Sequence, residues 1–225
     1  MRLVIAGGHG KIALLLTRLA ADRGDTVVGL VRNPDHVEDV RARGGDAVVL
    51  DLEAAQAEQV AAALAGADAV VFAAGAGPGS GVARKDTVDR AAAELVADGA
   101  EIAQVRRFLQ VSAMGLDRVT GDAAGDEVFS AYLRAKDAAE RDLRTRDLDW
   151  TILRPGRLTD DPPTGGVELA ESVRGAAVSR ADVAAVLLAL LDTPDTAGLT
   201  LELVGGQVPV EVAVQSAIGP RTRSQ

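Results

Sequence analysis

Residues 1–20 read MRLVIAGGHGKIALLLTRLA, which is a short apolar run, a glycine-rich turn and an amphipathic run in succession. Gly7 and Gly10 suit a tight turn whose backbone amides approach a pyrophosphate at the start of a helix, and Ala13 is small enough for close packing of that helix on the strand. The spacing G-x-x-G-x-x-A is looser than G-x-G-x-x-G, so its position between a first strand and a first helix makes it informative. We therefore predict a dinucleotide-binding turn.

The pair Gly10-Lys11 also invites comparison with the P-loop of nucleotide hydrolases. The P-loop pattern G-x-x-x-x-G-K-[ST] requires a different spacing from Gly7, and it requires a hydroxyl for magnesium where Ile12 stands. Nucleotide hydrolysis is therefore excluded. His9, inside the turn, is interpreted as a loop residue that its neighbours place beside phosphates rather than as a proton-transfer residue.

Apolar runs rich in Val and Ile alternate with longer Ala-, Leu-, Arg- and Asp-rich segments along the rest of the chain. This alternation is typical of buried parallel strands joined by crossover helices. We predict strands at 3–6, 26–31, 47–50, 69–73, 108–111, 150–153 and 200–204, and helices at 10–23, 34–43, 53–65, 85–103, 126–146, 180–191 and 209–218. This order predicts an α/β fold with a Rossmann-type, doubly wound parallel sheet, in which ligands bind beyond the carboxyl ends of the strands.

Residues 1–218 are expected to form a single Rossmann-type domain, because no internal repeat or long linker divides them. Residues 157–178 are rich in proline and glycine and break the periodic pattern, so we expect a small C-terminal cap over the substrate site there. The last residues, 219–225, are polar and are expected to form a frayed tail.

The composition excludes several kinds of mechanism. The 225 residues include no Cys, two His, five aromatic residues and 33 acidic against 24 basic side chains, for a net charge of −9. Without cysteine there is no thiol nucleophile or thiolate metal site, and the histidines lack metal-binding spacing, so we expect no metal. The acidic balance argues against nucleic-acid binding. The N-terminal apolar run is too short for a signal or membrane segment, so we expect a soluble, cytoplasmic protein without a membrane partner.

The second predicted strand runs into residues 30–34, LVRNP, where a dinucleotide fold that prefers NAD would carry an acidic residue. Arg32 stands there instead, and its guanidinium group can bind a 2′-phosphate and lie against the adenine, so NADP is favoured over NAD as cofactor. The alternative is a solvated arginine near the start of a helix. Asp51 and Leu52 follow the third strand and could flank the adenine, although Asp51 could equally cap the next helix.

Tyr132 and Lys136 lie four residues apart on the predicted helix 126–146, and therefore on one of its faces. The chain has a single tyrosine and three lysines, so chance is a poor explanation for this offset. A tyrosine with an ordinary pKa of about 10 is a reluctant acid-base group, and a nearby ammonium stabilises the phenolate and lowers that pKa. The pair predicts a proton-donating tyrosine with a lysine partner, and the alternative is two residues on a helix surface.

Several motifs occur in a fixed order along the chain: GGHGKIA after the first strand, VRNP after the second, AVVFAAGAG at the fourth, FLQVSAMG at the fifth, then YLRAKDAAE and LDWTILRPGRLTD. Together they resemble the short-chain dehydrogenase/reductase superfamily, and most closely its atypical, NAD(P)H-binding, NmrA-like branch. The resemblance runs from Met1 to about Gln207. The motifs are specific to the fold and the cofactor, and much less specific to a reaction.

The resemblance implies a cofactor contact for each matching residue. The residues that would cradle the pyrophosphate are Gly7, His9, Gly10, Lys11 and Ile12. Arg32 would bind the 2′-phosphate of the adenosine, with Asp51 and Leu52 flanking the adenine. The residues that would run along the ribose are Ala73, Ala74 and Gly75. Pro155 would lie beside the nicotinamide.

For catalysis, the resemblance makes Tyr132 the proton donor, while Lys136 binds the nicotinamide ribose and lowers the tyrosine pKa. Two departures bear on activity. Relatives often have two adjacent serines after the fifth strand, the second of which hydrogen-bonds the substrate carbonyl, and here Ser112 is followed by Ala113. The helical Asn that relays protons in many members has no counterpart, because the only Asn is Asn33. Ser112 is a third candidate catalytic residue.

The favoured function is an NADP-dependent oxidoreductase, in which a hydride passes between the nicotinamide and a small carbonyl or quinone-like substrate. One alternative is an NADP-binding, redox-sensing regulator without turnover, as some NmrA-like proteins are. Another is an epimerase-like enzyme, although about 70 residues after the sixth strand leave little room for a large substrate domain. A vestigial site is a third alternative. The identity of the substrate and the oligomeric state are left open.

Overall fold

The first strand carries buried side chains on both of its faces. In β1 (Arg2–Ala6), Leu3 and Ile5 join one hydrophobic core, and Val4 and Ala6 join another. All four side chains are fully buried. A strand of this kind needs helices on both faces of its sheet, because neither face can be left to water.

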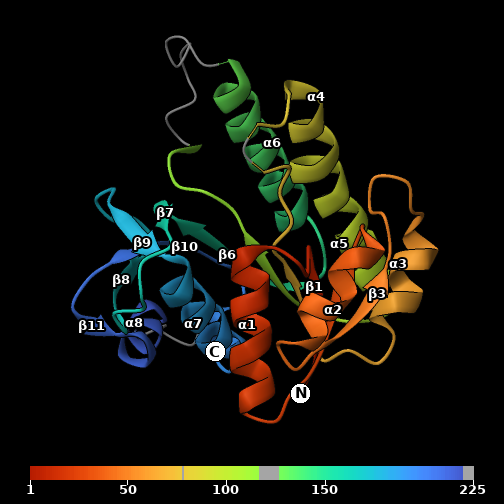
Figure 1. Ribbon diagram of the computed structural model, residues 1–225. Coiled ribbons are helices and arrows are strands. Elements are labelled where there is room, and N and C mark those ends of the chain that lie inside the picture. Colours follow the sequence, from red (N-terminus) through yellow and green to blue (C-terminus); the bar gives the residue numbers. More distant parts are fainter. Residues whose placement is uncertain (78, 117–126, 220–225) are drawn as a thin grey trace, which may run out of the picture.

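The computed structural model describes residues 1–77, 79–116 and 127–219 (Figure 1). The other strands of its main sheet are β2 (Thr26–Val31), β3 (Asp46–Val49), β4 (Ala69–Phe72), β5 (Arg107–Val111), β6 (Asp149–Pro155), β8 (Gly166–Ala170), β10 (Leu199–Gly205) and β11 (Val208–Pro209). Within the described residues, seven parallel strands follow the order β3-β2-β1-β4-β5-β6-β10. β8 and then β11 extend the sheet beyond β10 with antiparallel pairing. This is the doubly wound α/β sheet that the sequence predicts.

Helices cover both faces of the sheet (Figure 1). The helices are α1 (Lys11–Asp22), α2 (Val37–Arg41), α3 (Ala57–Leu64), α4 (Val82–Arg84), α5 (Ala92–Ile102), α6 (Glu127–Arg144), α7 (Arg180–Leu191) and α8 (Val210–Ala217), with 3-10 turns η1 (Pro34–His36) and η4 (Pro194–Thr196) and the π-helix η2 (Lys85–Ala91). α1, α7 and α8 contribute to the core that contains Leu3, whereas α3, α5 and α6 contribute to the core that contains Val4. The result is a three-layer α/β/α domain.

Most of the sequence-predicted elements are confirmed, and the differences have local causes. The helix predicted from residue 53 begins at Ala57, because the side chain of Gln56 and that of Gln59 form a capping box at its start. The single helix predicted for 85–103 is instead the π-helix η2 followed by α5, and the short helix α4 lies directly before it. Residue 126, the predicted start of the Tyr132 helix, and residues 220–225 of the predicted tail lie outside the described residues.

The predicted cap at 157–178 needs a correction in its middle part. Residues 166–170 alternate between buried Val167 and Leu169 and exposed Glu168, which is the pattern of a strand with one buried face, and they form β8 in the main sheet. Gly206 permits the neighbouring turn, since a Cβ atom there would lie 2.6 Å from the backbone carbon of Val167. The flanking strands β7 (Arg157–Thr159) and β9 (Ala177–Ser179) pair with each other in a separate two-stranded sheet.

The strand order places a topological switch point beside β1. β1 pairs with β2 on one side and with β4 on the other, so the loops that leave the carboxyl ends of these strands diverge. In sheets of this class, ligands bind in the crevice that this divergence opens. Among the residues that the structure describes, no helix has both the length and the apolar character needed to cross a membrane.

Candidate active site

The turn between β1 and α1 is shaped by three glycines. Gly7 has a φ of 82°, and a Cβ atom at this residue would lie 2.6 Å from Cα of Ala74. A Cβ atom at Gly8 would lie 2.5 Å from Cα of Gly29 in β2. The amide of Gly10 donates to the carbonyl of Gly7 at 2.9 Å, which closes the turn.

No side chain caps the start of α1, whose N-cap residue is Gly10. The first amides of an α-helix have no partner within the helix, and they attract anions together with the helix dipole. The cradle formed by the glycines, which any side chain would fill, fits the pyrophosphate of a dinucleotide. The chain's own residues are therefore suited to an NAD(P) cofactor.

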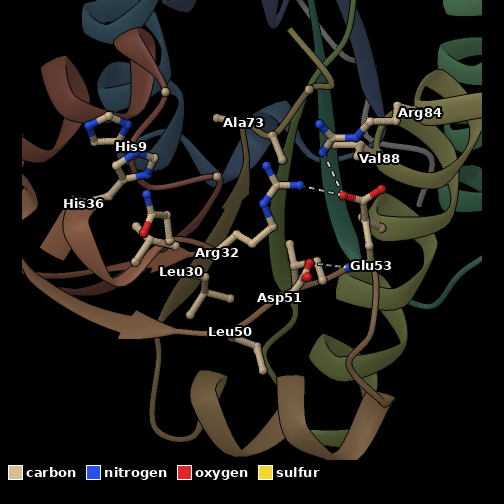
Figure 2. A pocket seen from close by; sticks show the side chains of 18 residues that line it. His9, Leu30, Arg32, His36, Leu50, Asp51, Glu53, Ala73, Arg84 and Val88 are labelled. Carbon is tan, nitrogen blue, oxygen red and sulfur yellow. Dashed lines mark hydrogen bonds and ion pairs between the residues drawn. The ribbon is translucent and has the colours of Figure 1, made fainter. Parts of the chain in front are cut away.

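A cavity of about 310 Å³ extends from this turn past the ends of β2, β3 and β4. Its lining includes most of the residues assigned to the pyrophosphate and adenosine, namely Gly7, His9, Gly10, Arg32, Asp51, Leu52, Ala73, Ala74 and Gly75. We refer to it as the adenosine cavity (Figure 2). The structure thus brings together residues that lie far apart in the sequence but follow successive parallel strands.

Glu53 holds two arginines at the edge of the adenosine cavity. Its Oε2 atom accepts hydrogen bonds from Nη1 of Arg32 at 2.9 Å and from Nη2 of Arg84 at 2.7 Å (Figure 2). Oε1 accepts from the hydroxyl of Thr87 at 2.7 Å. The hydrogen bond from Thr87, and then the contacts with Arg84 and Arg32, hold the pKa of Glu53 below its usual range.

Glu53 and Arg84 are two site residues that no sequence motif indicated. Glu53 directly follows the two residues expected to flank the adenine, and Arg84 comes from α4, which is a different part of the sequence. Two guanidinium groups, those of Arg32 and Arg84, therefore lie at the adenosine cavity, where the sequence predicted only that of Arg32. A second arginine near the adenosine cavity strengthens the electrostatic case for an anion there.

Two further features of the adenosine cavity concern Asp51 and the histidines. The Oδ1 atom of Asp51 accepts a hydrogen bond from the amide of Glu53 at 3.0 Å, so the Asp51 side chain closes the turn that it begins, and it remains exposed.

The imidazole rings of His9 and His36 are stacked, with centroids 3.5 Å apart (Figure 2). Nε2 of His9 lies 2.7 Å from Oδ2 of Asp39. His9 therefore lies at the rim of the cavity, packed against a histidine that the sequence analysis left without a role.

A second cavity of about 470 Å³ continues from the first, because Ala73, Ala74 and Gly75 line both. Tyr132 and Lys136 from α6 lie on its wall, together with Ser112 after β5 and Ile12 of α1. We refer to it as the reaction cavity. All three residues proposed for catalysis thus border one space that opens onto the expected dinucleotide groove.

Lys136 is held in place by two buried contacts. Its Nζ atom donates to the carbonyl of Val111 at 3.1 Å and lies 3.3 Å from Oδ1 of Asp89. The side chains of Lys136 and Asp89 are 4% and 1% exposed. Burial lowers the pKa of Lys136, and the charge of Asp89 opposes this effect. Asp89, on the π-helix η2, is thus the counter-ion of the lysine.

Tyr132 differs from the expectation in one respect. Burial, reinforced by the charge of Asp89, raises the pKa of Tyr132 above its ordinary value. The prediction that Lys136 lowers this pKa is therefore wrong. The Nζ atom of Lys136 lies 5.9 Å from the centroid of the tyrosine ring, and its charge is compensated by Asp89. The phenol is therefore kept protonated, which is the form that a proton donor needs.

The hydroxyl of Ser112 donates to a buried carboxylate. Oγ of Ser112 lies 2.5 Å from Oε1 of Glu140, which also accepts from Nε of Arg154. Oε2 of Glu140 accepts from Nη2 of Arg154 and from Nη2 of Arg144. Glu140 is fully buried. Because a hydroxyl has one proton, Ser112 can present only acceptor lone pairs to the reaction cavity in this arrangement.

Two predicted contacts lie outside the lining of both cavities. Nζ of Lys11 lies 2.5 Å from Oδ2 of Asp160, and the lysine side chain is 66% exposed. Lys11 is the first residue of α1, directly after the turn. Pro155 is the last residue of β6 and pairs with Leu203 of β10. Its place beside a nicotinamide stays a prediction.

Lys85 and Asp89 also line the reaction cavity, although neither was predicted to be part of the site. Both come from the π-helix η2, a form of helix that is rare and often occurs at functional sites. Their spacing of four residues gave no specific signal, since such pairs are common on helices.

Within the described residues, no group of three or more His, Asp or Glu side chains is arranged to hold a metal ion.

Known proteins resemble this chain over almost its whole length. A family model described as NAD(P)H-binding matches residues 7–194. The chain is 32% identical over 216 residues to YhfK of Bacillus subtilis (strain 168), a protein named as an uncharacterized sugar epimerase. That similarity covers 96% of this chain and 99% of the other.

Two solved structures extend the comparison. One, from Bacillus halodurans, is assigned by name to the NAD-dependent epimerases/dehydratases; it is 35% identical, covers 96% of this chain and 99% of its own, and has a TM-score of 0.87. The other, ChuY of Escherichia coli O157:H7, is named an anaerobillin reductase; it is 26% identical, covers 91% of this chain and 97% of its own, and has a TM-score of 0.77. The chain belongs to the NAD(P)H-binding family, an oxidoreductase- and epimerase-like group with a reductase among its structural neighbours.

Proposed function

We propose that this protein is an NADP-preferring oxidoreductase that reduces a small carbonyl or quinone-like substrate, with Tyr132 as proton donor and Lys136 as its partner. The observation that carries this proposal is the continuity of the two cavities. The only tyrosine of the chain and a buried lysine line a space that opens, through Ala73, Ala74 and Gly75, onto the cavity suited to adenosine. A dinucleotide laid along the groove would bring its nicotinamide to Tyr132.

The preference for NADP is argued from Arg32 and Arg84. Both guanidinium groups lie at the adenosine cavity and converge on Glu53. A 2′-phosphate carries more negative charge than the single carboxylate, and two arginines can bind its oxygens with paired hydrogen bonds. NAD has no 2′-phosphate, so both arginines would keep only their contacts with Glu53. We therefore favour NADP over NAD.

When bound, the nicotinamide would supply the hydride to the carbonyl carbon of the substrate. Tyr132 then delivers its proton to the carbonyl oxygen, so that C=O becomes CH–OH, and the phenolate regains a proton from solvent. Lys136, fixed by Val111 and Asp89, holds a positive charge near the phenolate as it forms. Burial keeps Tyr132 protonated before the step, which favours reduction over oxidation at neutral pH.

Ser112 supports this assignment by elimination. Its proton is donated to Glu140, so it is not available for a substrate carbonyl in the present arrangement. Tyr132 and Lys136 then remain among the three residues proposed for catalysis, and Lys136 is engaged by Val111 and Asp89, which favours Tyr132 as the donor for the carbonyl oxygen. Ser112 would accept a hydrogen bond from a substrate hydroxyl or amide instead.

The decisive experiment compares NADPH consumption by the unmodified protein and by Tyr132→Phe against a panel of quinones, aldehydes and ketones. Loss of the phenolic proton should lower turnover about 10²–10⁴-fold. NADPH affinity, measured by calorimetric titration, should stay within about twofold, because the phenol contributes little to cofactor binding. Unchanged turnover in Tyr132→Phe would remove Tyr132 from the mechanism.

An epimerase is the second candidate, because two similar proteins carry that name. An epimerase returns the hydride to the same substrate, so the cofactor is not consumed. Nucleotide sugars are therefore assayed with oxidised NADP and NAD, with product analysis by NMR. Isomerised sugar without net formation of reduced cofactor would replace the reductase proposal. If the protein binds NADPH tightly but is inactive on every compound, it is a redox-sensing regulator instead.

A further inference from the structure

Lys85 is a buried cation without a counter-charge in the part of the chain that the structure describes. Its residue exposure is 8%, and it lines the reaction cavity. Its Nζ atom donates to the carbonyl of Gly77 at 3.0 Å and lies 5.3 Å from the centroid of the Tyr132 ring. Neither contact supplies a negative charge, and Lys85 forms no ion pair with any described residue.

The charges around the reaction cavity do not cancel. The charged side chains among its described lining residues are Lys85, Lys136 and Asp89. Asp89 lies 3.3 Å from Lys136 and compensates the charge of that lysine. The positive charge of Lys85 is then not compensated by a described lining residue. A buried charge is costly unless it is paired, so an anion from outside the chain would stabilise it.

The cofactor does not supply this anion. The glycine turn suited to the pyrophosphate, with Gly7 and Gly10, lines the adenosine cavity and not the space beside Lys85. The nicotinamide ring is neutral when reduced and positively charged when oxidised, so it cannot act as a counter-ion. Neither the described residues nor the nicotinamide supplies this charge, which leaves the substrate as a source of it.

The remainder of the cavity wall is largely apolar. Val111, Leu158, Val128 and Phe129 contribute to it, and Phe129 is 50% exposed at the rim. Apolar and aromatic walls favour an apolar or planar body in the ligand, while a few polar groups fix its orientation. Tyr132 and Lys85 are neighbours across the ring face, so the reacting carbonyl and the anionic group would lie a few bonds apart.

We propose that Lys85 binds an anionic group of the substrate, so that the reaction cavity takes compact apolar or aromatic carbonyl compounds carrying a carboxylate. This inference rests on the proposed oxidoreductase function and adds the substrate class to it. Lys85 is the specificity residue, and Tyr132 remains the proton donor. The carboxylate displaces no interaction of Lys85 with Gly77, because an ammonium has three donors.

The test uses ortho- and para-carboxybenzaldehyde and their uncharged methyl esters as substrates of the full chain. The unmodified protein should have a kcat/KM roughly tenfold or more higher for at least one acid than for its ester, the size expected of a charge-assisted hydrogen bond. Lys85→Gln retains an amide donor but no charge, and should bring the ratio of kcat/KM for acid and ester to about one. Lys85→Arg should retain the preference for the acid.

The matched control is Arg18→Gln, an exposed residue of α1 whose loss changes the net charge equally. It should leave the preference unchanged. Equal kcat/KM for acid and ester in the unmodified protein would overturn the proposal without any variant. A Lys85→Gln protein that loses NADPH affinity and treats acid and ester as before would also overturn it, since Lys85 would then contact the cofactor.

A binding measurement separates this proposal from the oxidoreductase function. Benzoate and benzamide are titrated by calorimetry into the protein saturated with NADP, and benzoate should bind at least tenfold more tightly, with the difference lost in Lys85→Gln. If benzoate binds in this way and no aldehyde is reduced, the reductase proposal fails and the anion site stands. If aldehydes are reduced without any charge preference and benzoate has no advantage, the anion site fails alone.

Discussion

The ammonium of Lys136 lies 3.3 Å from Oδ1 of Asp89, and both side chains are almost completely buried. One comes from α6 and the other from η2, so the pair joins the helix that carries Tyr132 to the π-helix that carries Lys85. This contact fixes the proposed catalytic lysine and also couples two walls of the reaction cavity.

Removing either partner of this pair should destabilise the fold. Asp89→Asn and Lys136→Met each leave a buried charge unpaired, and each should lower the free energy of unfolding by about 3–5 kcal/mol. The double substitution should cost clearly less than the sum, because neither charge of this pair then remains without its partner. Urea unfolding of the four proteins measures the coupling. Additive losses would mean that the two charges do not interact.

The protonation state of Tyr132 predicts opposite pH profiles for the two directions of reaction. Since burial and Asp89 raise the pKa of Tyr132, the protonated donor persists as the pH rises, and kcat/KM for reduction should stay level from pH 7 to about 10. Oxidation of an alcohol needs the phenolate, so its kcat/KM should rise up to about tenfold per pH unit over that range. Steady-state kinetics in both directions checks this. A plateau for oxidation near neutral pH contradicts the raised pKa.

Arg32 and Arg84 should contribute comparably to the choice of cofactor. Arg32→Ala and Arg84→Ala are each expected to weaken NADPH binding about tenfold or more, and to change NADH binding by less than about twofold. Glu53→Gln removes a negative charge that competes with the 2′-phosphate, so it should tighten NADPH binding. Calorimetric titration with both cofactors measures this. Tighter binding of NADH than NADPH by the unmodified protein, lost in Glu53→Gln, would make Glu53 a ribose ligand instead.

Gly8 should tolerate no side chain. A Cβ atom there would lie 2.5 Å from Cα of Gly29, a backbone atom that cannot move without shifting β2. Gly8→Ala should therefore lower the free energy of unfolding by about 1–3 kcal/mol and weaken cofactor binding. Gly175→Ala is the control, because a Cβ atom at Gly175 would meet nothing within 4 Å. Thermal unfolding and NADPH titration compare the two; equal behaviour would contradict the close approach.

The sequence identified the central strands and the first helices because their apolar patterns are long and regular. β2 and α7 begin and end where the pattern predicts. β8 and β11 were missed, since short strands at the edge of a sheet among prolines and glycines carry little periodic signal. Their place depends on pairing with β10, which is a tertiary interaction.

The same distinction applies to the site. Residues directly following strands, such as Arg32 and Ser112, could be found because parallel strands end at one edge of the sheet. Their partners Glu53 and Glu140 could not, because each contact joins segments far apart in the sequence. The raised pKa of Tyr132 also depends on burial, which no spacing of residues reveals.

The π-helix η2 determines what the deletion of a single residue in this segment would do to the site. A π-helical turn closes with an i→i+5 hydrogen bond and so contains one residue more than an α-helical turn. Deleting one residue would restore α-helical spacing and rotate the segment before it by about 100° relative to α5. Arg84 and Lys85 would then turn away from the two cavities together. We therefore expect relatives with a one-residue gap in this helix to lack both cations at these cavities, and so to lack the proposed NADP preference and the proposed anion site.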